Sequence, residues 1–561
     1  MLPRHRGEIK NVVLPVLDGN GAGTPLPSSP SSCTIASTTR LKMAVRSFIL
    51  AAAATTLASA QITVDVTETH QVIRGLGYSE AFQRSQWVYN TMSEEKQQEM
   101  FDLLHDPVTG AGFSVLRIGI GSSANNSKDW MASIQPESPG SPDAEPTYVW
   151  DRNDSSQVWW AKEVQKRGVN LFYANSWGAD AYMKDTGSTD NGGLLCGVTN
   201  TSCETGDWRE QYANKLVQWI KYYAEEGINI THLNPLNEPD IAVPYASMQA
   251  DGQQTTDILE KLAPAVADAG LDVKITCCDW AGWEDGRRIL SGIQETGGEK
   301  YLDVVSGHGY GQPLSEPYDT PLEVWQGEWA ELSSYFDQPW YSAAGDPKGT
   351  YGGGEGLTWA NRILHSFTVS NISAFLNWMG AQPSNAATPV IRTVNDTNIL
   401  SKRYWAYAAF GRYARQDSSR VTATSTTDNI TVAAWVPQTA TFPAGGNLAM
   451  QIINNADEER TVPISIDQLR DITNYTALLL NNDFDLAESD SVVETNGTAI
   501  TATIPPRSLV VLAMDAVWPD GMVVNAQSEE NSASELGIRL PTSGGSLTPW
   551  MFMLLYLVRN Y

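Results

Sequence analysis

Short apolar runs alternate with longer amphipathic segments between residues 75 and 412. Eight of these runs are interpreted as strands, at residues 75–82, 114–120, 170–176, 228–236, 272–280, 302–310, 322–329 and 372–378. Eight strand–helix units over roughly 340 residues are typical of a (β/α)8 TIM barrel, an α/β fold. A doubly wound open sheet is the alternative.

The segments between the predicted strands have helical periodicity. Ser93 precedes an acidic first turn, where a hydroxyl cap and the helix dipole both favour a helix start. Farther along, aromatic and leucine side chains three or four residues apart predict one buried helix face, and Gly227 predicts its end. The residues of that face are Trp208, Tyr212, Leu216, Trp219 and Tyr223.

The helical period disappears after Tyr413, and alternating apolar runs separated by Asn, Asp, Gly and Pro predict a β-sandwich. A strand-like run at residues 61–66 lies outside the barrel units, so we expect the sandwich to be built from both chain ends. The expected domains are residues 61–74 and 413–516 for the sandwich and 75–412 for the barrel. Residues 517–561 are expected to be a disordered tail.

Residues 43–60 have an early Arg, an apolar run and Ala-Ser-Ala before Gln61, which is the layout of a secretory signal peptide. We interpret residues 1–42 as a mis-assigned or disordered leader. Nine Asn-x-Ser/Thr sequons agree with export and predict a secreted, extracellular glycoprotein. In that setting, Cys196 and Cys203 are expected to form a disulfide, with buried thiols as the alternative.

Composition narrows the range of partners. The net charge of −27 over 561 residues disfavours binding to nucleic acid or to anionic membranes, and it suits neutral or weakly charged partners. We expect a monomer. The apolar run at 549–558 is too short to span a bilayer; a lipid-anchor signal and a gene-model error are the two explanations for it.

Two carboxylates fall at the carboxyl ends of predicted strands, where barrels of this kind carry their active groups. Glu238, in the motif NPLNEPD, ends the fourth strand, and Glu328, in LEVWQGEW, ends the seventh. Glycoside hydrolysis needs such a pair, one protonated to release the leaving oxygen and one ionised to attack the sugar. Taken singly, Glu238 is also consistent with a turn acid and Glu328 with a rim acid.

Side chains near the two carboxylates suit a sugar. Asn237 is placed to hydrogen-bond a hydroxyl beside the reacting carbon. Aromatic residues at strand ends can stack on sugar rings or pack in the core: Trp177, Trp280, Tyr310, Trp329 and Trp378. Glu80, Asp279 and Glu331 also lie near strand ends, and we interpret these three acids as structural.

Other chemistries lack their motifs. The run GIGSSA, residues 119–124, fits a dinucleotide-binding pattern, but no predicted helix opens after it. The sequence contains no nucleophile elbow, no H-E-x-x-H and no P-loop.

The ordered motifs RGLGYSEAFQR, LRIGIGSS, NPLNEPD, SGHGYG, VWQGEW, FLNWMG and YWAYAAFGRYAR resemble glycoside hydrolase family 30 over about residues 61–515. EAFQR and LRIGIGSS look most like its fungal subfamily 7 of xylanases and glucuronoxylanases. The resemblance implies a retaining double displacement with Glu238 as acid/base and Glu328 as nucleophile, without metal or organic cofactor. The implied substrate is β-1,4-xylan, often branched with glucuronic acid.

The resemblance also suggests finer roles. Arg84 fits the position at which some members bind the branch carboxylate, and Arg117 would orient Glu328. The loop from Ser122 to Ser155 is a candidate wall for one end of the cleft. Two alternatives stay open: a β-1,6-glucan or galactan hydrolase on the same fold, and a non-catalytic carbohydrate-binding barrel.

Overall fold

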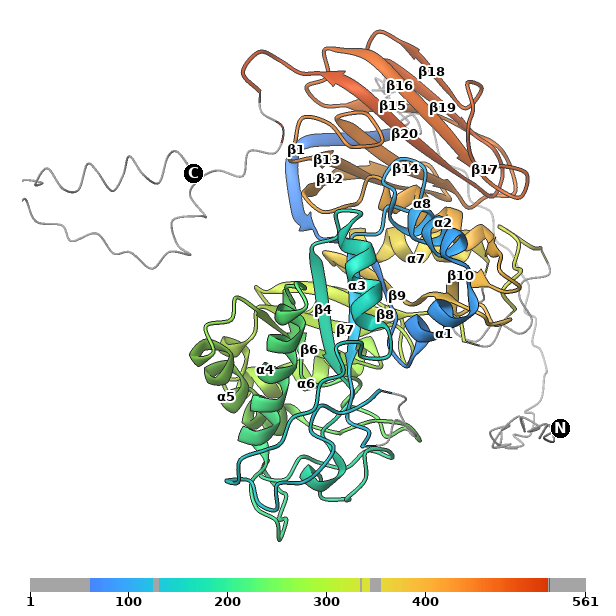
Figure 1. Ribbon diagram of the computed structural model, residues 1–561. Coiled ribbons are helices and arrows are strands. Elements are labelled where there is room, and N and C mark those ends of the chain that lie inside the picture. The colour runs from blue at the N-terminus through green and yellow to red at the C-terminus, as the bar shows by residue number, and fades with distance from the viewer. Residues whose placement is uncertain (1–60, 125–130, 333–334, 344–354, 523, 525–561) are drawn as a thin grey trace, which may run out of the picture. The chain divides into compact units, whose positions relative to one another are not determined.

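The computed structural model describes residues 61–124, 131–332, 335–343, 355–522 and 524 (Figure 1). The predicted leader and signal peptide, the apolar run at 549–558 and part of the 122–155 loop lie outside the described residues.

Eight parallel strands form a closed barrel, as predicted. In chain order they are β2 (Gly75–Ser79), β3 (Val115–Ile120), β4 (Leu171–Ser176), β5 (His232–Asn234), β6 (Lys274–Trp280), β7 (Val304–His308), β8 (Glu323–Trp329) and β9 (Ala374–Gln382). Each pairs with its neighbour, and β9 pairs with both β8 and β2, which closes the barrel. The carboxyl ends of all eight strands therefore meet at one mouth.

Helices follow most of the strands. They are α1 (Arg84–Thr91), α2 (Glu94–His105), α3 (Gln157–Gln165), α4 (Arg209–Glu225), α5 (Gly252–Asp268), α6 (Trp283–Glu295), α7 (Gly356–Thr368) and α8 (Lys402–Gly411). Two short 3-10 helices, η1 (Ala181–Met183) and η2 (Glu299–Tyr301), lie in the connecting loops.

The local signals read from the sequence hold in α2 and α4. The Ser93 side chain caps α2 by accepting from the Lys96 N–H. All five residues of the predicted face at the start of and along α4 are buried. Gly227 follows the helix with φ of 80°, a backbone conformation that favours glycine and ends the helix.

A second sheet holds ten strands, from both ends of the described chain. They are β1 (Ile62–Ile73), β12 (Ser418–Ser425), β13 (Ile430–Pro437), β14 (Leu448–Asn454), β15 (Arg460–Ile466), β16 (Asp471–Leu480), β17 (Asp485–Glu488), β18 (Val493–Asn496), β19 (Ala499–Ile504) and β20 (Ser508–Val517). Strand β1 pairs antiparallel with β12 and parallel with β15. The first strand thus joins the two halves of the predicted sandwich.

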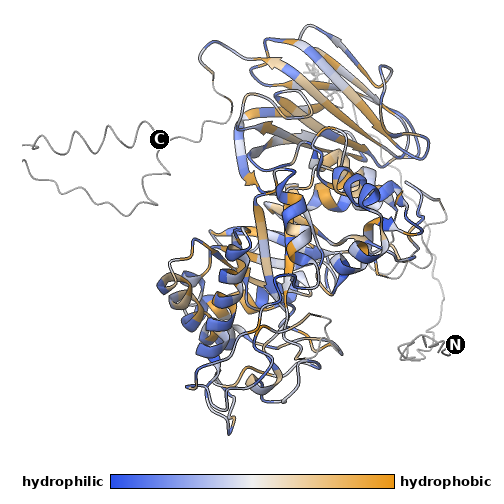
Figure 2. Ribbon diagram, viewed as in Figure 1, coloured by the Kyte–Doolittle hydropathy of each residue, from blue (hydrophilic) through white to orange (hydrophobic). Residues whose placement is uncertain are grey.

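The barrel and the sandwich share a continuous apolar core. Trp435 of β13 packs edge-on against Phe367 of α7, with 5.3 Å between ring centroids. The Gln451 side chain of β14 donates to the carbonyl of Ala409 on α8 at 2.7 Å. The other face of the sandwich strands packs on itself, around residues such as Val64 and Leu512. Apolar residues run along the barrel strands, apolar and polar residues are mixed along the sandwich strands, and polar residues are common on the surrounding helices (Figure 2).

Two short strands, β10 (Pro389–Thr393) and β11 (Asn398–Leu400), extend from β9. The expected Cys196–Cys203 disulfide is formed, and it closes a loop before α4. The adjacent Cys277 and Cys278 on β6 are both fully buried. Within the described residues, no helix combines the length and apolar character needed to cross a membrane.

Candidate active site

Glu238 and Glu328 meet at the mouth of the barrel. Glu238 follows β5, and Glu328 lies near the end of β8. A carboxylate oxygen of each, together with one ring nitrogen of His308, lie within 4.8 Å of one another. The spacing fits the roughly 5–5.5 Å of a retaining glycosidase pair and is shorter than the roughly 6.5–9.5 Å of an inverting pair.

The two glutamates line one pocket of about 630 Å³. Three of the five strand-end aromatics reach it, together with residues from the strand ends, the start of α1 and the loops at the barrel mouth. The lining residues are Phe82, Arg84, Trp177, Glu238, Ile241, Tyr245, Ala281, Tyr310, Gly311, Glu328, Leu332 and Trp378. The pocket therefore combines aromatic walls with two acids, which is the composition expected of a sugar site.

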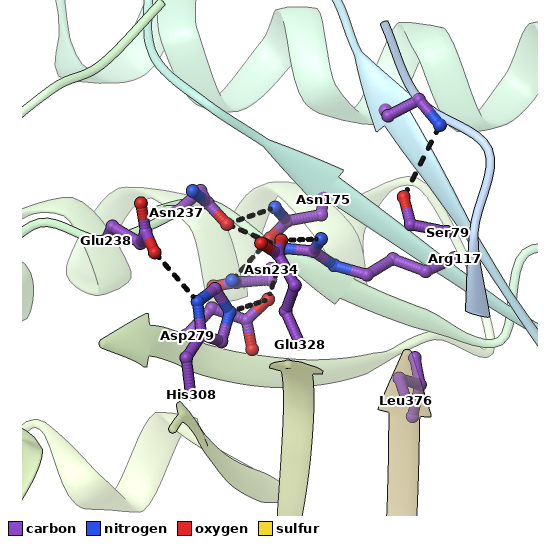
Figure 3. A network of polar contacts seen from close by, with 12 residues as sticks. Ser79, Arg117, Asn175, Asn234, Asn237, Glu238, Asp279, His308, Glu328 and Leu376 are labelled. Atoms are coloured by element: carbon purple, nitrogen blue, oxygen red, sulfur yellow. Dashed lines mark hydrogen bonds and ion pairs between the residues drawn. The ribbon is translucent and has the colours of Figure 1, made fainter. Parts of the chain in front are cut away.

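Arg117 of β3 is the centre of the polar network beneath the pocket (Figure 3). Its guanidinium contacts Glu328 Oε2 and donates to Asn237 Oδ1 at 2.6 Å and to Asp279 Oδ2 at 2.8 Å. Burial acts to lower the pKa of Arg117, but the negative charges of Asp279 and Glu328 outweigh burial and raise it. Arg117 is thus a permanent cation beside Glu328.

Glu328 has a second donor on its other oxygen, because the Tyr310 hydroxyl donates to Oε1 at 2.9 Å. Burial and the charge of Glu238 raise the pKa of Glu328 above its ordinary value, although Arg117, His308 and the Tyr310 hydrogen bond act to lower it. Two hydrogen-bond donors in contact with its oxygens stabilise the ionised carboxylate. Glu328 is therefore equipped to serve as an anion.

Glu238 has a different neighbour. His308, at the end of β7, lies with Nδ1 3.0 Å from Glu238 Oε1. Burial acts to lower the pKa of His308, but the charges of Glu328 and Asp279 raise it to about 10. The imidazole is therefore charged at neutral pH, so Nδ1 donates its hydrogen to Glu238.

Asp279, which we interpret from sequence as a structural acid, lies in contact with the polar network of the site. It is fully buried at the end of β6, and its Oδ2 lies 2.8 Å from Arg117 Nη2 and 3.6 Å from His308 Nε2. Burial acts to raise the pKa of Asp279, but Arg117 and His308 hold it well below its usual range. Asp279 is an ionised member of the site.

Asn237 is committed to this network through its oxygen. Its Oδ1 accepts from Arg117 and from Asn175 Nδ2, the latter at 3.1 Å. Because both bonds use the oxygen, the amide NH2 is the group available for a sugar hydroxyl.

The strand-end aromatics divide into two groups. Trp177, Tyr310 and Trp378 line the pocket. Trp280 is fully buried against Tyr318, and Trp329 packs on Trp359, so these two belong to the core rather than to a sugar platform.

Phe82 joins the aromatic walls of the pocket. Its ring lies edge-on to Trp177, Trp378 and Tyr245, with centroid distances of 5.1, 5.7 and 5.8 Å. Sequence reasoning missed Phe82 and Tyr245, although Phe82 lies within the motif RGLGYSEAFQR. Tyr245 lies in a loop, where no hydrophobic period marks a residue as functional.

Arg84 lies at the start of α1 and lines the pocket. Its Nη1 donates to the carbonyl of Phe82 at 2.9 Å, and its guanidinium lies 4.3 Å from the ring centroid of Trp87. Burial lowers the pKa of Arg84 to about 10, which leaves the side chain charged at neutral pH. The pocket therefore has a cation on its wall, apart from the one beneath it.

Among the described residues, Glu238, His308 and Glu328 form a group close enough to hold a metal ion. A ligating histidine must be neutral, and the neighbouring acids keep His308 protonated. The donor set therefore fits a proton-transfer site better than a metal site.

A (β/α)8 barrel with two facing glutamates at the ends of strands four and seven is the arrangement of a glycoside hydrolase. A family model described as "O-Glycosyl hydrolase family 30" matches residues 59–288. The catalytic domain of GH30 xylanase C from Talaromyces cellulolyticus is 34% identical, with a TM-score of 0.73; the match covers 81% of this chain and 99% of that one. The chain belongs to glycoside hydrolase family 30.

Two more distant similarities are found, one to a solved structure and one to a curated sequence. A family 30 subfamily 8 xylanase from Clostridium acetobutylicum is 21% identical, with a TM-score of 0.59 and coverage of 81% of this chain and 100% of that one. A curated protein, putative glucosylceramidase 2 of Caenorhabditis elegans, is 22% identical over 281 residues, which are 47% of this chain. The match spans about half of that relative, 51% of its length.

Proposed function

We propose that this protein is a secreted, retaining glycoside hydrolase that cleaves β-1,4-xylan, with glucuronoxylan as the preferred form. The observation that carries the proposal is the pair Glu238 and Glu328, which face each other within 4.8 Å in one aromatic-walled pocket. The 34% identity to a protein described as a GH30 xylanase supports the choice of xylan.

The two glutamates divide the reaction by their surroundings. In the first step the Glu238 carboxyl gives its proton to the glycosidic oxygen while a Glu328 oxygen attacks the anomeric carbon. The carbon–oxygen bond to the leaving sugar breaks and a glycosyl ester forms. In the second step Glu238 takes a proton from water, whose oxygen attacks the same carbon and releases Glu328 as a carboxylate.

The assignment of nucleophile and acid rests on hydrogen-bond donors. Glu328 is contacted by Arg117 and by the Tyr310 hydroxyl, so its charged form is stabilised. Glu238 lines the open pocket, where it can reach the leaving oxygen. Trp177 and Trp378 would pack against the sugar faces, and the Asn237 amide would donate to a hydroxyl.

Glu328→Gln tests the proposal with glucuronoxylan as substrate. We expect release of xylo-oligosaccharides to fall by roughly 10⁴-fold or more, because an amide cannot form the ester. Glu323→Gln on the same strand is the matched control, since Glu323 pairs with Arg74 away from the pocket. Wild-type rates in Glu328→Gln would refute the assignment. Products from β-1,6-glucan or galactan alone, or binding without turnover, would favour the alternatives.

Arg84 is proposed to bind the glucuronic acid branch, because it is the charged fork on the pocket wall and carboxylates suit such a fork. We expect Arg84→Ala to lower kcat/KM on glucuronoxylan by roughly 10- to 100-fold. Unbranched xylan should be little affected. Arg84→Lys keeps the charge and loses the fork. Its kcat/KM on glucuronoxylan should therefore lie between those of the wild type and Arg84→Ala. Equal losses on both substrates would remove this role.

Secretion and glycosylation also belong to the proposal. The disulfide Cys196–Cys203 suits an oxidising compartment. Eight of the nine sequon asparagines are described by the structure, and all eight are exposed, as an attached glycan requires. They are Asn153, Asn200, Asn229, Asn371, Asn395, Asn429, Asn474 and Asn496; Asn125 lies outside the described residues.

A further inference from the structure

A chain of charged contacts links the two glutamates without passing through the pocket. It runs from Glu238 to His308 at 3.0 Å, from His308 Nε2 to Asp279 Oδ2 at 3.6 Å, and from Asp279 to Arg117 at 2.8 Å. Arg117 then contacts Glu328. Five strands and strand ends contribute one group each, and acids alternate with cations along the chain (Figure 3).

Asp279 is the middle of this chain, and the fold holds its position closely. Its backbone N–H donates to Ser306 Oγ at 3.1 Å, and its carbonyl accepts from the Glu238 N–H at 3.0 Å. Glu238 and Asp279 both have positive φ, 48° and 50°. Asp279 therefore touches the acid/base through the backbone as well as through His308.

Strand β8, which is separated from β6 by β7, makes room for the Asp279 carboxylate. Gly327 precedes Glu328 on β8, and a Cβ at Gly327 would lie 2.0 Å from Asp279 Oδ1. A side chain at this position would therefore displace either Asp279 or the strand that carries Glu328.

A charged imidazole has a hydrogen on both ring nitrogens. With Asp279 facing Nε2, His308 can only donate from Nδ1 to Glu238 Oε1. The proton that Glu238 gives to the glycosidic oxygen must then lie on Oε2. The arrangement thus fixes which oxygen of the acid/base is its proton donor.

We propose that Asp279 is a positioning residue that keeps His308 charged against Glu238 and, through Arg117, couples the acid/base to the charge on Glu328. This inference rests on the proposed function for the roles of the two glutamates. The contacts themselves do not depend on the substrate.

Several charged or titratable groups surround Asp279 and His308, and the test must separate Asp279 from them. They are Arg117 on β3, Tyr173 on β4, Glu238 and Asp240 after β5, Tyr310 and Tyr318 after β7, and Glu328 on β8. Asp279→Asn changes one charge and keeps the shape of the side chain. The amide can still accept from Arg117 or donate to His308 Nε2.

The pH dependence of kcat/KM is the first readout. The basic limb reports the acid that must be protonated, here Glu238. In Asp279→Asn, His308 loses one of the two negative charges that raise its pKa, Glu328 being the other, so the cation beside Glu238 is lost at a lower pH than in the wild type. Glu238 then keeps its proton to higher pH. We expect the basic limb to move upward by roughly 1 pH unit. The loss in kcat should be larger for aryl β-xylobiosides with poor leaving groups, which need acid catalysis most.

Asp180→Asn is the matched control. Asp180 is also a buried acid, paired with Lys215 at 2.6 Å, and it does not contact either glutamate. Its loss should lower stability and leave the basic limb in place. An unmoved limb in Asp279→Asn, or an equal shift in Asp180→Asn, overturns the proposal.

A second measurement needs neither turnover nor the Asp279 variant. We expect ¹⁵N NMR of the wild-type imidazoles, with His308→Asn to assign the signal, to show His308 charged through pH 8. Titration of His308 near its ordinary pKa in the wild type overturns the proposal whatever the substrate proves to be. If glucuronoxylan is not cleaved but His308 stays charged, the proposed function fails and the Asp279–His308 pairing stands.

Discussion

Removal of the Tyr310 hydroxyl should shift the pKa of Glu328 in a defined direction. The hydroxyl donates to Glu328 Oε1, and a donor to the charged form lowers the pKa of a carboxyl. In Tyr310→Phe the pKa of Glu328 should therefore rise, and the acidic limb of kcat/KM should move upward. A hydrogen bond to a charged group contributes about 1.5–3 kcal/mol, so the limb should move by roughly 1 to 2 pH units.

Tyr318→Phe provides the control for this prediction. The Tyr318 hydroxyl is buried and has no hydrogen-bond partner among the described residues. Removing it should leave both limbs unchanged. The assignment of Glu328 as the ionised nucleophile would be contradicted if Tyr310→Phe lost activity with its acidic limb in the wild-type position.

The location of individual site residues was predictable from sequence where it depended on the ends of strands. Glu238, Glu328 and the adjacent Asn237 were placed at the mouth because parallel strands of a barrel end there together, whereas Arg84 was suggested by the family resemblance. The role of Asp279 was not predictable, because its partners Arg117 and His308 are 162 and 29 positions away in the chain, and only the closed sheet brings them together.

At the scale of elements, the strongly apolar strands were predictable and the weakly patterned ones were not. All eight barrel strands overlap the predicted runs, because strands buried on both faces are mostly apolar. Strand β1 continues to Ile73, beyond the predicted 61–66. The prediction stopped early because the second half of the strand is mostly polar and only partly buried. The short strands β10 and β11 carry too few residues to show a period.

The sequence pattern also could not show which strand-end aromatic residues face the pocket and which pack in the core. A Trp at a strand end looks alike in sequence whether it faces the pocket or the next layer. Trp378 of β9 faces the pocket, whereas Trp329 of β8 turns outward to α7, where it meets Trp359. The local shifts in pairing between β8 and β9 decide these directions, and pairing is a tertiary property.

For the whole molecule, the shared core between barrel and sandwich sets the unfolding behaviour. Trp435 of β13 is fully buried, contacts Phe367 of α7 and donates through its indole N–H to Gln451. Gln451 in turn donates to Ala409 of α8. Because apolar and polar contacts cross the joint together, we expect the two parts to unfold in one cooperative transition.

Trp435→Ala tests this cooperativity. Truncation of a buried Trp costs about 3–5 kcal/mol, and this loss should lower the stability of barrel and sandwich strands equally. Hydrogen exchange of β3 and β14 followed in urea, with mass spectrometry, measures both parts at once. Phe484→Ala, an exposed apolar residue of the sandwich, should change stability by less than about 0.5 kcal/mol. Loss of protection confined to the sandwich strands in Trp435→Ala would show two independent folding units, and the barrel would then not need the sandwich to hold Glu238 and Glu328 in place.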